Sequence, residues 1–200
     1  MPRVYLSPSL ENYNHFIDGG TEQEYVNLIA DAMEPTLLSS AIEFSRNEAS
    51  MTLSQVISYV NGGDYDVYVS IHTTTAPPTF SGSMRGINVF YFIGNPYSEE
   101  LADCVIKNLK NIYDIKSTMK KIPTMTIKEL TCTKIPAVLI ELGYNDNEED
   151  ARWIKDNINT IGEALSFSLA EYFSTSLFRP EKNWNLGVTQ YMLELGKGIY

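Results

Sequence analysis

The sequence predicts a single α/β domain whose mostly parallel, twisted sheet is flanked by helices on both faces. The chain has 200 residues, which is the ordinary size of one domain, and 44% of them are hydrophobic. Strand-like and helix-like segments alternate along it, as in sheets whose strands are joined by helices. The segment 136–144 is a continuous apolar run, and in 66–72 Val67, Val69 and Ile71 alternate with Tyr68, Ser70 and His72. Both patterns are typical of central strands packed on both faces.

The first expected strand and helix are separated by a polar loop. "RVYLS" (3–7) is the strand, and the loop up to Gly20 is rich in Ser, Asn, Asp and Gly. Thr21 is the expected N-cap of the helix, because Glu24 stands three residues later at the capping-box position. Pro35 is expected to kink or end this helix. Its expected buried stripe comprises Val26, Ile29, Ala30, Met33 and Leu37.

A second strand and helix follow in the same order. "IEFSR" (42–46) is the strand, and "TLSQVISYVNGG" (52–63) is the helix. Gly62 and Gly63 are the expected stop signal of this helix. Its expected buried residues are Leu53, Val56, Ile57 and Val60.

The second half of the chain continues the alternation. A strand at 87–94 precedes a helix at 98–114, and the apolar strand at 136–144 precedes a short and a long helix within 148–173. The long helix is expected to bury Ile158, Ile161, Leu165 and Leu169. Residues 179–200 contain one helix-like stretch, 189–196, without a clear core role. We therefore expect a domain over 1–178 and an extension of unknown role over 179–200.

Composition excludes several classes of protein. The formal net charge of −10 argues against binding to nucleic acid or to an anionic membrane surface, because either requires a basic patch. No apolar run approaches the ~20 residues of a membrane span. "MPRVYLSPS" leads directly into a strand, so we expect a protein made in the cytoplasm without a secretory signal. Cys104 and Cys132 lack C-x-x-C spacing and are expected to be reduced thiols.

Three polar residues converge on one edge of the expected sheet. His72 lies at the carboxyl end of one strand, where α/β proteins bind ligands. Glu141 lies near the end of the second apolar strand, and Glu22 begins the first helix. A buried carboxylate requires a compensating partner. Zinc is such a partner, because zinc sites in hydrolases use His and Glu ligands and keep one position open for water.

Each of these residues also has a purely structural interpretation. His72 could be a core histidine with a satisfied hydrogen bond, and Glu22 could offset the dipole of its helix. Glu141 is harder to explain in this way, because charged residues inside buried strands are uncommon. The chain has no H-E-x-x-H motif and no cysteine cluster, so spacing alone does not identify a zinc site.

Five segments resemble the motifs of one family. They are "YLSPS" (5–9), "TEQEYVNLIADAM" (21–33), "DVYVSIHTTT" (66–75), "GINVFYF" (86–92) and "PAVLIELGYNDNEEDARWI" (136–154). The last segment is the most specific of the five. Together, from about residue 3 to residue 173, the chain resembles the zinc-dependent N-acetylmuramoyl-L-alanine amidases of the Amidase_3 type, which are cell-wall hydrolases.

The resemblance implies roles for individual residues. Glu22 and His72 correspond to zinc ligands of the family, and Glu141 corresponds to its catalytic glutamate. Gly86 matches a family glycine, and Asn147 and Asp150 match the pattern that trails the catalytic residue.

Two positions depart from the family pattern. The family has a first ligand histidine in the loop after its first strand, whereas this chain reads "SPSLENYNHF" (7–16). Related loops place the histidine nearest to Tyr13, and the only histidine available here is His15. We expect His15 to be the third zinc ligand; the alternative is that Tyr13 has replaced it. Thr74 stands where the family often has asparagine.

The function implied by the resemblance is cleavage of peptidoglycan at the amide between N-acetylmuramic acid and L-alanine by a zinc-activated water. The partner is then the stem peptide and glycan of peptidoglycan, and the place of action is the cell wall. Two alternatives stay open: a non-catalytic relative that binds peptidoglycan or a partner protein, and a zinc peptidase. A serine hydrolase is disfavoured, because the chain has no G-x-S-x-G motif.

Overall fold

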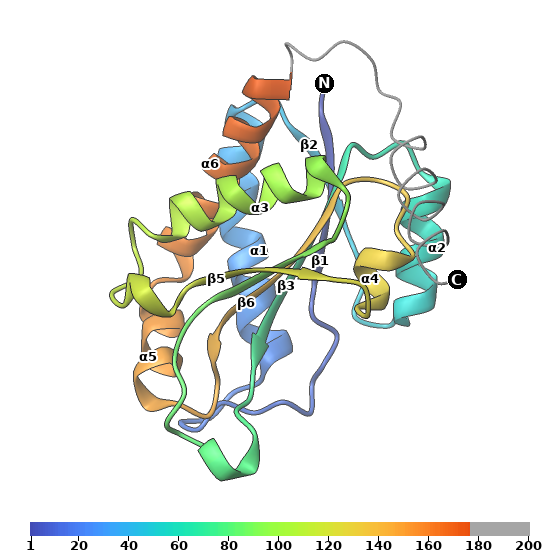
Figure 1. The fold of residues 1–200 in the computed structure, drawn as a ribbon. Coiled ribbons are helices and arrows are strands. Elements are labelled where there is room, and N and C mark those ends of the chain that lie inside the picture. Colours follow the sequence, from blue (N-terminus) through green and yellow to red (C-terminus); the bar gives the residue numbers. More distant parts are fainter. Residues whose placement is uncertain (177–200) are drawn as a thin grey trace, which may run out of the picture.

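A computed structural model describes residues 1–176, which form a six-stranded sheet between helices (Figure 1). The order of the strands across the sheet is β2-β1-β3-β6-β4-β5. The strands are β1 (Arg3–Pro8), β2 (Glu43–Arg46), β3 (Val67–Thr74), β4 (Asn88–Phe92), β5 (Lys120–Thr124) and β6 (Ala137–Tyr144). The expected extension at 179–200, with its helix at 189–196, lies outside the described residues.

The sheet is mostly parallel, as predicted. β1 pairs in parallel with β2 and β3, and β3 pairs in parallel with β6. β4 runs antiparallel to β6, and β5 runs parallel to β4. The carboxyl ends of β1, β3 and β6 therefore meet at one edge, where the amino end of β4 also lies.

Helices cover both faces of the sheet, which confirms the predicted fold class. α1 (Glu22–Ser39), α3 (Pro96–Leu109) and α6 (Ile158–Ser176) cover one face, where α6 packs against both α1 and α3, with α5 (Glu148–Asp156) at their end (Figure 1). α2 (Leu53–Gly62) and the one-turn α4 (Lys128–Thr131) cover the opposite face. The short 3-10 helices are η1 (Pro78–Phe80) and η2 (Lys116–Thr118).

The first helix follows its predicted pattern. Thr21 caps α1, and its side-chain oxygen accepts a hydrogen bond from the backbone N–H of Glu24 at 3.2 Å. Pro35 lies inside the helix, which continues to Ser39 and does not end there. The whole predicted stripe is buried: Val26, Ile29, Ala30, Met33 and Leu37. This stripe attaches α1 to the sheet, so the position of its first residue, Glu22, is determined by the core.

The second helix is confirmed in its bounds but not in all its contacts. Thr52 and Gln55 form a capping box at its start, and the helix ends at Gly62 with Gly63 as the C-cap. Val56 and Val60 are buried, whereas Leu53 is 37% exposed, so the expectation that Leu53 is buried was wrong. Leu53 belongs to the first turn of α2, where it lines a surface cavity and is not in the core.

Two elements were not anticipated from the sequence. β5 reads "KKIPT", which is polar and contains Pro123, as edge strands tolerate. α4 is a single turn of four residues, too short for an apolar period to appear. α4 nevertheless carries a residue of the site, Glu129.

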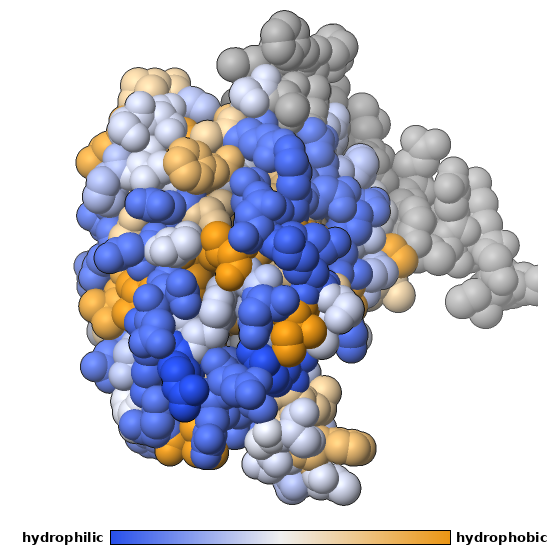
Figure 2. Space-filling model, turned by 90° about the vertical axis from the view of Figure 1, so that its left-hand side faces the viewer, coloured by the Kyte–Doolittle hydropathy of each residue, from blue (hydrophilic) through white to orange (hydrophobic). Residues whose placement is uncertain are grey.

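The surface and the cysteines complete the description. The face shown in Figure 2 is mostly hydrophilic, and its hydrophobic residues form small separate groups, which is ordinary for a protein surface. Within residues 1–176, no helix is long and apolar enough to cross a membrane. Cys104 is buried and Cys132 is exposed, and both are free thiols as expected.

Candidate active site

The site lies where β3 and β6 end, on the sheet face covered by α2 and α4. His72 and Glu141 are register partners on these adjacent parallel strands, so their side chains project from the same face. Tyr68 and Ser70 share that face, because alternate residues of β3 point the same way. The strand pairing thus brings together two residues that are 69 positions apart in the chain, as the sequence predicted.

Glu22 reaches His72 from the start of α1. Its side chain is fully buried, and its Oε1 lies 3.0 Å from Nδ1 of His72. Its other oxygen, Oε2, accepts hydrogen bonds from the Thr73 hydroxyl and from Nδ2 of Asn14, both at 3.0 Å. The backbone N–H of Glu22 also donates to the carbonyl of Asn14 at 2.8 Å. The loop before α1 therefore closes over this carboxylate and holds it against the imidazole.

A second carboxylate, which the sequence analysis missed, lies on the other side of the ring. Oε1 of Glu129 is 3.6 Å from Nε2 of His72 and accepts hydrogen bonds from Tyr68 (2.9 Å) and Ser70 (2.7 Å). Nε2 of His72 is also 3.0 Å from the Ser70 hydroxyl. Glu129 lies about 60 positions from its partners, in a polar stretch without periodicity. The only signal in the sequence was the polar row Tyr68, Ser70 and His72, which indicates that a polar partner faces it.

These contacts shift the pKa values of His72, Glu22 and Glu129. Burial opposes a charged His72, but hydrogen bonds and negative charges from Glu129 and Glu22 raise its pKa to about 10. Burial also opposes ionisation of Glu22, but hydrogen bonds from His72, Ser9 and Asn14 lower the pKa of its carboxyl. The pKa of Glu129 is lowered for the same reason, by His72, Ser70 and Tyr68. The imidazole of His72 therefore lies between two carboxylates, Glu22 and Glu129.

Glu141 occupies a different environment. Burial raises the pKa of its carboxyl, and the hydrogen bond from Asn88 together with the charge of His72 offsets this only in part. Nδ2 of Asn88, the antiparallel register partner on β4, lies 2.8 Å from Oε2 of Glu141. Because a raised pKa makes the ionised carboxylate a stronger base, Glu141 is suited to accept a proton.

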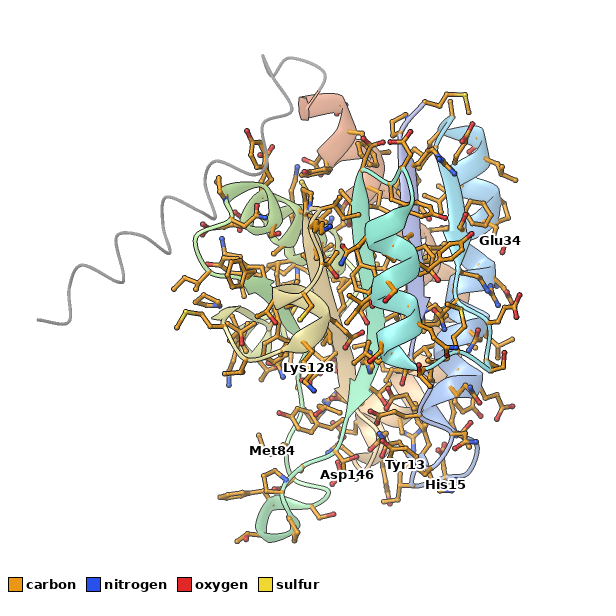
Figure 3. The ribbon with its side chains drawn as sticks, turned by 90° about the vertical axis from the view of Figure 1, so that its right-hand side faces the viewer. Tyr13, His15, Glu34, Met84, Lys128 and Asp146 are labelled. Carbon is orange, nitrogen blue, oxygen red and sulfur yellow. The ribbon has the colours of Figure 1, made fainter. Side chains whose placement is uncertain are left out.

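The structure does not bring His15 to this group. Its side chain is exposed on the loop before α1, and its backbone pairs with Thr21 in an isolated bridge. Figure 3 shows His15 at the same end of the molecule as Tyr13 and Asp146, on the outer side of the loop. Asn14 lies closer to Glu22. Its Nδ2 donates a hydrogen bond to Glu22 and another to Oε2 of Glu11, the second at 2.5 Å.

Two of the three protein ligands expected for a catalytic zinc ion, Glu22 and His72, lie together in the structure. A carboxylate and an imidazole 3.0 Å apart, Glu22 and His72, are ligand types that zinc uses. Within residues 1–176, no three His, Cys, Asp or Glu side chains are arranged to hold a metal ion. Zinc binding by His15 would therefore require the loop at 9–15 to change its conformation.

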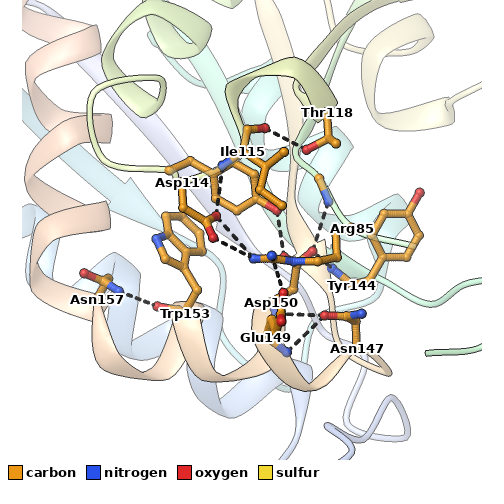
Figure 4. Close-up of polar contacts among 12 residues, drawn as sticks. Arg85, Asp114, Ile115, Thr118, Tyr144, Asn147, Glu149, Asp150, Trp153 and Asn157 are labelled. Carbon is orange, nitrogen blue, oxygen red and sulfur yellow. Dashed lines mark hydrogen bonds and ion pairs between the residues drawn. The ribbon is translucent and has the colours of Figure 1, made fainter. Parts of the chain in front are cut away.

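Asn147 and Asp150, which follow β6 in the chain, anchor the rim of the site. Asn147 caps α5, and Asp150 is fully buried and bound to Arg85 (Figure 4). Oδ1 of Asp150 accepts from Arg85 Nε (2.9 Å) and the Tyr113 hydroxyl (2.7 Å), and Oδ2 accepts from the N–H groups of Gly86 and Tyr144 (both 3.0 Å). Arg85 also pairs with Asp114 and Glu149 at the surface. Gly86 has φ +136°, and a Cβ there would lie 2.4 Å from the Thr118 carbonyl, so glycine is required.

Asp146 holds the loop that follows β3. Its side chain accepts hydrogen bonds from the N–H groups of Ala76 and Gly82, at 3.0 and 2.9 Å, and from the Ser81 hydroxyl at 3.0 Å. Nδ2 of Asn147 donates to the Gly82 carbonyl at 2.7 Å. Four hydrogen bonds from the start of α5 therefore fix a loop that projects beyond the sheet (Figure 1).

The fold is similar to that of solved amidases. The N-acetylmuramoyl-L-alanine amidase AmiC2 of Nostoc punctiforme superposes with a TM-score of 0.75 at 17% identity, covering 86% of this chain and 97% of that one. The CwlD amidase from Clostridioides difficile, solved in complex with the GerS lipoprotein, superposes with a TM-score of 0.74 at 20% identity, covering 88% and 100%. These likenesses show the fold, a single α/β domain that the chain shares with solved amidases.

The sequence identifies the family. Residues 12–170 match the model of Amidase_3, N-acetylmuramoyl-L-alanine amidase, and the chain belongs to this family. An uncharacterized cell wall amidase of Bacillus anthracis is 28% identical over 160 residues, 68% of this chain and 29% of that protein. The probable cell wall amidase LytH of Staphylococcus aureus is 30% identical over 113 residues, 54% and 36%. The chain spans about a third of the length of these relatives.

Proposed function

We propose that this protein is a zinc-dependent peptidoglycan hydrolase that cleaves the amide between N-acetylmuramic acid and L-alanine, and that it acts at the cell wall. One observation carries the proposal: family membership coincides with an assembled group in which His72 contacts Glu22 and lies beside Glu141. Each of these residues has the side-chain chemistry that zinc-assisted amide hydrolysis requires.

Glu22 and His72 would hold the zinc ion, and the loop at 9–15 would supply a third ligand, for which we propose His15. When bound, zinc would supply an acidified water and polarise the scissile carbonyl. The hydrogen bonds from Thr73 and Asn14 to Glu22 keep its carboxylate oriented towards His72.

Glu141 is the proposed catalytic residue. In its ionised form it would accept a proton from the attacking water and then return it to the leaving amine of L-alanine. Asn88 donates a hydrogen bond to one oxygen of Glu141 and so helps to orient its carboxylate. The raised pKa of Glu141 favours the first half of this cycle, because it makes the ionised carboxylate a stronger base.

The exposed position of His15 supports a second candidate, a non-catalytic relative that binds peptidoglycan. The two candidates differ in the products they leave. Purified peptidoglycan is incubated with the protein and zinc, and the released fragments are analysed by mass spectrometry. Stem peptides with a free L-alanine amino group support the amidase. New amino groups at another peptide bond would indicate a zinc peptidase, and binding without release would indicate the non-catalytic relative.

A further inference from the structure

The hydroxyl of Ser70 joins His72 to Glu129. Ser70 is fully buried on β3, two residues before His72, and its Oγ lies 3.0 Å from Nε2 of the imidazole. The same oxygen lies 2.7 Å from Oε1 of Glu129 and 3.3 Å from the backbone carbonyl oxygen of Ser7. One hydroxyl therefore contacts a ring nitrogen and two oxygens that can accept its hydrogen.

The number of hydrogens in this group determines the direction of each hydrogen bond. A serine hydroxyl has one hydrogen to donate, and a carbonyl or a carboxylate can only accept. Since the hydrogen of Ser70 is directed to Glu129 or to Ser7, it is not available to His72. The 3.0 Å contact with Nε2 is then a hydrogen bond in which the imidazole is the donor. This arrangement places a hydrogen on Nε2 of His72.

Glu129 strengthens this direction. Its Oε1 is the nearer of the two acceptors of Ser70, and hydrogen bonds to a charged acceptor are stronger than those to a neutral one. The same oxygen lies 3.6 Å from Nε2, so its negative charge also attracts the hydrogen on that nitrogen. The hydroxyl of the fully buried Tyr68 donates to this oxygen at 2.9 Å and helps to fix its position.

The opposite ring nitrogen of His72 is thereby left for a metal ion. Nδ1 faces Oε1 of Glu22 at a distance of 3.0 Å. A neutral imidazole carries a hydrogen on one nitrogen only, so a hydrogen on Nε2 leaves the lone pair of Nδ1 directed towards Glu22. Histidines that bind a metal ion through one nitrogen are held in one tautomer by the hydrogen bond that the other nitrogen makes.

We propose that Ser70 and Glu129 are positioning residues, which keep the hydrogen of His72 on Nε2 and so direct Nδ1 to a metal ion shared with Glu22. The proposal rests on the proposed function for the presence of a metal ion at His72. Ser70 and Glu129 act through the imidazole and take no part in the proton transfers assigned to Glu141.

The first test identifies the nitrogen that binds the metal. The chain contains two histidines, so isotope-labelled histidine gives two sets of ring-nitrogen signals in NMR spectra, and the His72 set is the one retained in His15→Ala. The protein is loaded with a spin-active cadmium isotope as the probe. We expect scalar coupling between cadmium and Nδ1 of His72, with the hydrogen on Nε2. Coupling to Nε2 would overturn the proposal.

The second test removes the acceptor. Glu129→Ala is expected to weaken zinc binding at least about tenfold in calorimetry, the loss typical of outer partners of a metal-binding histidine. Glu129→Gln keeps an oxygen for Ser70 and Tyr68 and is expected to stay within about threefold of the wild type. Glu48→Ala removes an exposed carboxylate before α2 and is the control for charge. Equal losses in Glu129→Ala and in either comparison variant would overturn the proposal, as would unchanged affinity in Glu129→Ala.

The third test removes the hydroxyl. Ser70→Ala is expected to weaken zinc binding at least about tenfold, because Nε2 loses its hydrogen-bond acceptor. Ser166→Ala is the matched control, since Ser166 is also fully buried and its hydroxyl donates to the Met33 carbonyl on the helical face of the domain. Equal losses in the two variants would assign the effect to stability and overturn the role of Ser70.

Release of stem peptides from peptidoglycan by the wild type separates this proposal from the proposed function. Cadmium bound through Nδ1 without any release would overturn the amidase and keep the positioning role. Release together with binding through Nε2 would keep the amidase and overturn the positioning role. An absence of metal binding at His72 would overturn both the zinc dependence and the positioning role.

Discussion

Two charged centres lie at the same end of the molecule, one around His72 and one around Asp150, and they differ in the basic group that each contains. Asp150 is fully buried and accepts four hydrogen bonds, two on each oxygen. Its cationic partner, Arg85, cannot lose its proton at physiological pH. In the His72 centre, the group between the carboxylates of Glu22 and Glu129 is an imidazole, which can change its protonation state or bind a metal ion.

The difference is the one we expect between a structural centre and a reactive one. Where each carboxylate oxygen has two donors and the cation is permanent, as at Asp150, the group holds its neighbours in place. An imidazole between two carboxylates, as at His72, can exchange its proton for a metal ion, which is the role that we propose for it. Both centres contain buried carboxylates, so burial alone would not distinguish them.

The strongest test of the structural centre is Asp150→Ala. It leaves Arg85 partly buried without its inner partner and removes four hydrogen bonds, so we expect a loss of about 3–5 kcal/mol in the free energy of unfolding. Urea denaturation measures this loss. Asp114→Ala removes the exposed partner of the same arginine and should cost less than about 1 kcal/mol. Similar losses in the two variants would contradict the assigned difference between inner and outer partners.

The reactive centre is tested by Glu141→Gln, which removes the proton acceptor while preserving size and the contact with Asn88. We expect a loss of at least about 100-fold in the release of stem peptides, because general acid–base groups contribute at least that much. Zinc content, measured by elemental analysis, should not change. Glu24→Gln, the same change at an exposed position of α1, is the control. Activity within tenfold of the wild type would rule out the role of Glu141.

The third prediction concerns the loop that should complete the reactive centre. His15→Ala is expected to weaken zinc binding by at least about tenfold, because it removes a proposed ligand. Zinc titration followed by calorimetry measures the affinity directly, without reference to activity. Glu11→Gln is the comparison, since Glu11 lies in the same loop and shares the Asn14 amide with Glu22. Unchanged affinity in His15→Ala with a loss in Glu11→Gln would move the third ligand to Glu11.

The smallest expected effect is on pH dependence. Glu141 acts as a base only when ionised, so activity falls as the pH drops through its pKa, which burial already raises. Asn88→Ala removes a hydrogen bond that favours the ionised form, and should move this acidic limb upwards by about one pH unit. The pH profile of kcat/KM measures the shift. A downward shift would show that Asn88 favours the protonated carboxyl.

Much of the fold was predictable because its signals are local. The stripe of α1, its cap at Thr21 and the stop at Gly63 each depend on residues within a few positions. β5 and α4 escaped prediction because a polar edge strand and a single helical turn have no period to detect. The antiparallel direction of β4 also escaped, since it depends on pairing with β6 across the sheet.

The residues of the candidate site also differ in whether the sequence carries a local signal for them. Glu22, His72 and Glu141 were found because each occupies a position with a strong local signal, a helix start or a strand end. Glu129 carried no such signal, since its partners lie about 60 positions away and only the folded sheet brings it to them. The environment of His15 was unpredictable for a related reason, because spacing does not determine the path of a loop.

The four hydrogen bonds that Asp146 and Asn147 make to the loop after β3 have a thermodynamic consequence. Ordering a loop of this length costs conformational entropy, and here the cost falls on folding and not on the encounter with a ligand. A ligand that meets this rim would therefore find it preorganised. Association should then show a small entropic penalty from the protein, and a heat capacity change that reflects only the apolar surface covered.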